Sequence, residues 1–168
     1  MKTLLLIRHA KASPAEPGRP DHDRALDDRG RQDAPEMGRR LKLRGVMPGL
    51  IVSSTALRTR TTARLIAEAL DFPLERLVED ERVYASSAMR LLYLVQALDN
   101  KLACVIVVGH NPEMTELARK FSDEIPDLPT CAVAEFGFHT EAWSDIGRLA
   151  PAVSRFDSPK KRQDSSPP

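Results

Sequence analysis

The chain has 168 residues, a length typical of one domain with a core of its own. Its 25 basic and 24 acidic side chains give a formal net charge of +1, which argues against a nucleic-acid partner. No stretch is apolar for long enough to be a signal peptide or a membrane span, so we expect no membrane association. Two cysteines, Cys104 and Cys131, are too few for a disulfide framework, and we expect both to be reduced core residues of a cytoplasmic protein.

Short apolar runs alternate with segments of helical periodicity along most of the chain. This order predicts one α/β domain over residues 1–157, built as a three-layer α/β/α sandwich with a mostly parallel central sheet. The last strand is expected to pair with the one before it as a possible antiparallel edge, and residues 158–168 to form a disordered tail. The predicted strands are 3–7, 50–53, 77–78, 102–108, 131–138 and 148–156, and the predicted helices are 29–44, 54–70, 87–98 and 112–121.

A long polar loop separates the first strand from the first helix. Residues 13–28 are rich in Pro, Asp and charge and lack periodicity, so we expect them to cover the ligand site. Asp27 or Asp28 is suited to cap the helix over 29–44. Pro35 lies inside that helix and predicts that the helix either kinks or begins later.

Three of the predicted strands are followed by an Arg or a His. Arg8 and His9 follow the first strand, Arg58 lies in the first turn of the helix after the second strand, and His110 follows the strand over 102–108. The carboxyl ends of parallel strands meet at one sheet edge, where ligands bind. Guanidinium groups match phosphate oxygens, and imidazole is a nucleophile or a hydrogen-bond donor, so this set predicts a phosphoryl site. Positioning and fixed positive charge dominate phosphoryl transfer, so we expect that no metal is required.

Taken in order along the chain, these motifs resemble the histidine phosphatase superfamily, which includes the phosphoglycerate mutases. They are most similar to its small SixA-type phosphohistidine phosphatases. The resemblance covers nearly the whole chain, to about Lys160. The matching stretches are LIRHAKA, DRALDDRGRQDA, SSTALRTRTTA, VYASS, VVGHNPEMTELA and LPTCAVAEF, followed by Trp143.

The resemblance implies a phosphoglycerate mutase-like fold and a phosphatase that needs no cofactor. It implies that His9 is the nucleophile and is transiently phosphorylated. It also implies that Arg8, Arg58 and His110 form the phosphate pocket, with Asn111 as a further substrate-binding residue. The chain is short and lacks a large insertion that would build a lid. We therefore expect the substrate to be a phosphohistidine on a partner protein, such as a phosphorelay or phosphotransfer domain.

The chain departs from the superfamily at several positions. Ala12 stands where a Ser or Thr is usual, so a phosphate-contacting hydroxyl is lost or shifted to Ser13. Thr55 and Thr61 replace a usual Pro and Gln, and we expect neither to touch the chemistry. The general acid is not assigned. The candidate carboxylates are Glu79 and Glu81, with Asp80 between them, and Asp21 or Asp23 of the long loop.

Two other functions fit the same residues. One is a phosphatase of small phosphate esters or sugar phosphates that uses the same mechanism, and the other is a non-catalytic phosphate-binding or adaptor protein. A protonated imidazole leaves well without an obvious acid, which favours phosphohistidine. Several residues are predicted to lie outside the chemistry. His22 and His139 are expected to be exposed to solvent, Tyr84 and Trp143 to pack in the core or at the rim, and residues 160–162 to be solvated.

Overall fold

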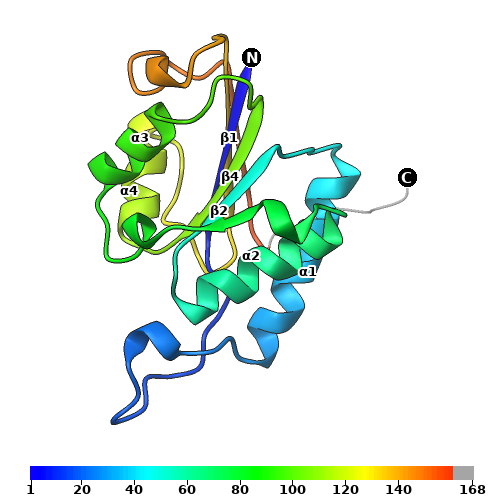
Figure 1. The fold of residues 1–168 in the computed structure, drawn as a ribbon, viewed down its shortest axis with the longest axis vertical. Helices are drawn as coiled ribbons and strands as arrows, with labels where there is room; N and C mark the ends of the chain where they lie inside the picture. Colours follow the sequence, from blue (N-terminus) through cyan, green and yellow to red (C-terminus); the bar gives the residue numbers. More distant parts are fainter. Residues whose placement is uncertain (161–168) are drawn as a thin grey trace.

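The structure is a computed structural model, and it describes residues 1–160. A six-stranded sheet with the strand order β3-β2-β4-β1-β5-β6 forms the middle layer (Figure 1). The strands are β1 (Lys2–Arg8), β2 (Leu50–Ser53), β3 (Leu77–Glu79), β4 (Cys104–Gly109), β5 (Val133–Phe138) and β6 (Val153–Asp157). The helices are α1 (Asp28–Leu43), α2 (Leu57–Ala69), α3 (Ala88–Gln96) and α4 (Glu113–Phe121).

Helices cover both faces of the sheet. Successive side chains of a strand point to opposite faces, so β1 serves two cores. Leu4 and Leu6 pack with residues of α3 and α4, whereas Leu5 and Ile7 pack with residues of α1 and α2. Figure 1 shows the two helix pairs on opposite sides of the sheet. The predicted three-layer α/β/α sandwich is confirmed.

The strand directions differ in part from the prediction. β3, β2, β4 and β1 are parallel, but β5 is antiparallel to β1 and β6 is antiparallel to β5. The predicted antiparallel edge is thus present, and β5 is a second reversal that the sequence analysis did not include. The loop after α4 returns to the carboxyl end of β1, where the Cys131 N–H donates to the carbonyls of Arg8 and His9. β5 starts at that edge and therefore runs back along β1.

Three predicted boundaries require correction. α1 does not begin late, because it starts at Asp28 and contains Pro35, and the Asp27 carboxylate caps it by accepting a backbone N–H at 2.8 Å. α2 begins at Leu57, three residues later than predicted, with Ala56 as its N-cap, and the Ser54 hydroxyl contacts His110. β6 begins at Val153, five residues later than expected, because the chain turns before it.

The packed part of the chain extends beyond the predicted boundary at residue 157. Ser158 is buried, and its carbonyl accepts a hydrogen bond of 2.9 Å from the buried Arg40. The predicted tail therefore starts too early, and its residues 161–168 lie outside the described part of the chain. Trp143 is buried as expected, and both cysteines are free, with Cys131 in the core. Within residues 1–160, no helix is both long and apolar enough to cross a membrane.

Candidate active site

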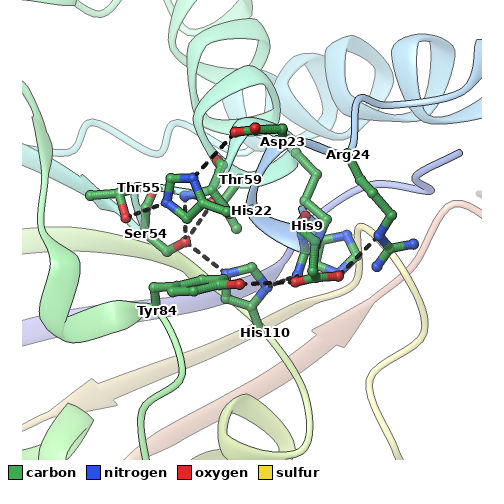
Figure 2. A network of polar contacts seen from close by, with 12 residues as sticks. His9, His22, Asp23, Arg24, Ser54, Thr55, Thr59, Tyr84 and His110 are labelled. Atoms are coloured by element: carbon green, nitrogen blue, oxygen red, sulfur yellow. Dashed lines mark hydrogen bonds and ion pairs between the residues drawn. The ribbon is translucent and has the colours of Figure 1, made fainter. Parts of the chain in front are cut away.

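The register of two parallel strands brings His9 and His110 together. Arg8 at the end of β1 is opposite Gly109 at the end of β4, and the His9 N–H donates to the Gly109 carbonyl at 3.0 Å. The two imidazoles leave the sheet side by side, with ring centroids 5.4 Å apart (Figure 2). Arg58, in the first turn of α2, reaches His110 with its Nη2 atom at 3.2 Å. The three predicted strand ends thus meet at one edge of the sheet.

The neighbours of His110 determine which of its nitrogens carries the proton. A guanidinium group only donates, so Nδ1 of His110 accepts from Arg58. Nε2 is then the protonated nitrogen, and it donates to the Ser54 hydroxyl at 2.7 Å. Burial, with the positive charge of Arg58 next in size, lowers the pKa of His110 to about 3. His110 is therefore a neutral imidazole at pH 7.

The same reasoning leaves one nitrogen of His9 without a proton. Nδ1 lies 2.7 Å from the carbonyl oxygen of Ala10, which can only accept, so Nδ1 is the donor. Burial, and to a lesser extent the charges of Arg58 and Arg8, lower the pKa of His9 to about 4. The Nε2 lone pair is therefore free at pH 7, and a neutral imidazole in this state is a nucleophile.

Arg8 and Asn111 share one acceptor. Arg8 Nη1 and Asn111 Nδ2 donate to the carbonyl of Leu128, at 3.0 and 2.9 Å. The Nε atom of Arg8 is buried and has no hydrogen-bond partner among residues 1–160. Arg8 and Asn111 also line an open groove of about 680 Å³ that runs along α4. Both residues are thus accessible from solvent through this groove.

The long loop reaches into the site through Asp21, as expected for a loop that covers it. Arg58 donates to the backbone carbonyl of Asp21 at 2.8 Å and to its carboxylate at 2.9 Å. Arg24 and the Tyr84 hydroxyl also donate to this carboxylate, each at 3.0 Å. Burial alone would raise the pKa of Asp21, but the hydrogen bonds from Arg58 and Tyr84 hold it below its ordinary value. Asp21 therefore occupies both terminal nitrogens of the Arg58 guanidinium, Nη1 with its backbone carbonyl and Nη2 with its ionised carboxylate.

The other candidate carboxylates lie apart from this cluster. Glu79 is exposed and lies 3.6 Å from Arg60, on α2. Glu81 is exposed in a short 3-10 helix, and Asp80 caps that helix and pairs with Arg82.

His22 is partly exposed, with 38% of its side chain accessible, but it also has contacts in the site that the prediction did not include. Its Nε2 atom lies 2.8 Å from the Thr55 hydroxyl, and its ring meets Tyr84 edge-on at 4.8 Å. Tyr84 in turn meets the His110 ring at 5.5 Å, so it lies at the rim of the site, as predicted. Figure 2 shows His22 and Tyr84 beside His110. His139 is exposed, as predicted.

Sequence reasoning missed Ser54 and Tyr84 as contacts of the site, although both lie within the motifs SSTALRTRTTA and VYASS. Among residues 1–160, no group of three His, Cys, Asp or Glu side chains is arranged to hold a metal ion. The charged groups that act on His9 are the guanidinium groups of Arg58, Arg8 and Arg24. Such a set is suited to bind an oxyanion.

Comparisons with known proteins agree with this geometry. The sequence pattern of the histidine phosphatase superfamily (branch 1) matches residues 4–84. A crystal structure of an Agrobacterium tumefaciens chain assigned to the SixA phosphohistidine phosphatases is 30% identical, with a TM-score of 0.74 over 80% of this chain and 90% of that one. The protein histidine phosphatase SixA complexed with tungstate shares the fold, with 22% identity and a TM-score of 0.76 over 94% and 97% of the two chains. An uncharacterised chloroplastic protein of Arabidopsis thaliana is 29% identical over 89% of this chain and 72% of its own length.

The chain belongs to the histidine phosphatase superfamily and is of the SixA type. Its fold is the phosphoglycerate mutase-like α/β sandwich, and its class is that of the phosphatases, which are hydrolases.

Proposed function

We propose that this phosphatase removes the phosphoryl group from a phosphohistidine on a partner protein, through a phospho-His9 intermediate and without a metal or other cofactor. The partner is a phosphorelay or phosphotransfer domain. The observation that carries the proposal is the neutral His9, whose Nε2 lone pair is free and whose surroundings hold the guanidinium groups of Arg8 and Arg58. The predicted location in the cytoplasm forms part of the proposal.

The reaction takes place in two displacements. In the first, Nε2 of His9 attacks phosphorus, the P–N bond to the substrate imidazole breaks, and that imidazole, already protonated on its other ring nitrogen, leaves as the neutral base. In the second, water attacks the phosphorus of phospho-His9, the new P–N bond breaks, and inorganic phosphate is released. Arg8 and Arg58 neutralise the phosphoryl oxygens, while His110 and Asn111 complete the pocket. The charge of the transferring group is spread over these oxygens, so fixed cations stabilise the transition state.

Two features support phosphohistidine as the substrate class. The groove beside Arg8 is open, which suits a phosphoryl group presented on another protein. The carboxylate of Asp21 is ionised in the free site, so it has no proton to give at pH 7. A protonated imidazole leaving group needs less help from an acid than an alkoxide does. Glu79 and Glu81 stay predictions as general acids.

The test is turnover of a phosphohistidine-bearing protein beside a panel of small phosphate esters, in excess EDTA, by wild type and by His9→Ala. We expect selective loss of phosphate from phosphohistidine, abolished by the substitution and unchanged by the chelator. Preference for a small ester would mean that the substrate is a small phosphate ester, hydrolysed by the same mechanism. Phosphate binding without any turnover would mean that the chain is a binding protein.

A further inference from the structure

Arg8 also lines a second cavity, on the side of the site away from α4. This cavity has a volume of about 280 Å³ and is lined by the basic side chains of Arg8, Lys11, Arg29 and Lys160, together with Pro129 and Thr130. No carboxylate is among its lining residues. We call the four basic side chains the basic subsite.

The basic subsite is a local excess of positive charge in a chain that is otherwise nearly balanced. Most surface arginines are paired with carboxylates, as in the contacts Arg60–Glu79 and Arg119–Asp127. Within residues 1–160, neither Lys11 nor Lys160 has a carboxylate within ion-pair distance. Arg29 has only Asp33, at 3.5 Å, one turn along α1 and outside the cavity lining. The cavity thus gathers cations that are mostly uncompensated.

Close packing holds Lys11 beside the start of α1. The carbonyl of Lys11 accepts the N–H of Asp27 at 3.0 Å. Gly30 packs so closely on this segment that a Cβ atom there would lie 2.2 Å from the Lys11 carbonyl oxygen. Arg29, the residue before Gly30, is therefore held next to Lys11 by the backbone itself.

The opposite wall is fixed from the core. The buried guanidinium of Arg40 donates to the carbonyls of Ser158 and Pro159, at 2.9 and 3.4 Å. These contacts hold the segment after β6 against the domain and bring Lys160 to the cavity. Segments from four parts of the chain thus meet at this cavity. Backbone and buried side-chain contacts fix the segments, and their basic side chains line the cavity.

We propose that the basic subsite binds an aspartate or glutamate carboxylate of the partner protein, close in space to its phosphohistidine. Arg8 lines both this cavity and the groove along α4, so a phosphoryl group at Arg8 and a carboxylate in the basic subsite are bound side by side. This inference rests on the proposed function. It adds that the protein prefers a phosphohistidine that has aspartate or glutamate residues nearby.

The experiment compares two synthetic phosphohistidine peptides that differ only in flanking residues, Asp and Glu in one and Asn and Gln in the other. Each is assayed with wild type, with Lys11→Gln/Arg29→Gln, and with Arg64→Gln/Lys101→Gln, which removes the same charge from exposed positions outside the cavity. Exposed charge pairs are individually weak, so we expect wild type to prefer the acidic peptide by about fivefold in kcat/KM at low salt. The preference should shrink in high salt.

The ratio of the two kcat/KM values within each protein is the readout. A ratio that falls to about one in Lys11→Gln/Arg29→Gln, and is retained in Arg64→Gln/Lys101→Gln, supports the basic subsite. Equal turnover of both peptides by wild type overturns the basic subsite and leaves the proposed function standing. An equal loss of preference in both double variants overturns it as well, because net charge alone would then explain the effect. Hydrolysis of neither peptide overturns the proposed function, and the acidic-partner inference is overturned with it.

Discussion

The two histidines of the active site have complementary tautomers because their neighbours differ in what they can donate. A backbone carbonyl fixes the proton of His9 on Nδ1, and a guanidinium fixes that of His110 on Nε2. Asp21, a residue of the long loop, holds Arg58 at the same time. Without a ligand, the site therefore holds two neutral imidazoles, and the Arg58 guanidinium is already bound to the Asp21 carboxylate.

Asp21→Asn is expected to strengthen the binding of tungstate or inorganic phosphate by roughly threefold to tenfold. The carboxylate competes with the ligand for Arg58 and also repels it, and the amide removes the charge. Calorimetric titration at fixed ionic strength measures the effect. Asp23→Asn is the matched control, because Asp23 faces His22, at 3.7 Å, instead of Arg58. Unchanged or weaker binding by Asp21→Asn would contradict the competition.

Ser54→Ala is expected to lower both turnover and stability, the latter by about 1–3 kcal/mol, because it removes the acceptor of the buried His110 Nε2–H. Nitrogen NMR of the imidazoles should show that His110 keeps its proton on Nε2 in this variant, because Arg58 still donates to Nδ1. Ser53→Ala is the control, since the buried Ser53 hydroxyl donates to a backbone carbonyl and does not contact His110. Equal stability of Ser54→Ala and Ser53→Ala, or a mixed His110 tautomer in Ser54→Ala, would contradict this account of the His110 contacts.

At the scale of elements, the site depends on how the start of α1 meets the end of β1. Gly30 permits this contact, because any larger side chain would overlap the backbone of Lys11. The sequence predicts the helix and offers Asp27 or Asp28 as its cap, since both are local signals, and the structure selects Asp27. It does not show that a helix terminus and a strand end touch, because that contact joins residues about twenty apart in the chain.

Gly30→Ala is expected to destabilise the protein by about 2 kcal/mol or more, since the added methyl group meets backbone instead of a movable side chain. Urea unfolding measures the change. Arg31→Ala, at an exposed position one residue further in α1, is the control and should lie within about 0.5 kcal/mol of wild type. Equal stability of the two variants would show that α1 can shift away from Lys11 at little cost.

The limits of prediction at this scale have specific causes. The sequence correctly predicts that four residues meet at one edge of the sheet, because each follows a strand and parallel strands end at a common edge. These residues are Arg8, His9, Arg58 and His110. The direction of β5 was missed, because it is decided by where the loop after α4 returns. The contacts of His22 with Thr55 and Tyr84 were missed for a related reason, since a loop without periodicity carries no signal of what its side chains contact.

For the molecule as a whole, the two active-site histidines lower the free energy of unfolding at acidic pH. Both imidazoles are held neutral in the folded state, with a pKa of about 4 for His9 and about 3 for His110, whereas each titrates near 6.5 when unfolded. Below pH 6.5 the unfolded chain therefore binds more protons than the folded chain. The contribution of these groups to stability is complete above pH 6.5 and is lost as the pH falls toward 4.

The free energy of unfolding should thus fall between pH 6.5 and 4.5 with a slope that approaches about 1.4 kcal/mol per pH unit for each of the two histidines. The slope is measured by urea unfolding across this range. His9→Asn removes one of the two titrating groups. The contribution of the two histidines to the slope should therefore fall by about half in this variant. An identical slope in wild type and His9→Asn would mean that His9 protonates as readily in the folded chain as in the unfolded one.

The central claim is that His9 carries the phosphoryl group between substrate and water. The most direct measurement is rapid quenching of the reaction with a radiolabelled phosphohistidine-bearing protein at alkaline pH, followed by mapping of the label on this chain. We predict an acid-labile, alkali-stable phosphoramidate on His9 that forms and decays at least as fast as turnover, and none in His9→Asn. Turnover without any labelled His9, or label retained in His9→Asn, would contradict the mechanism.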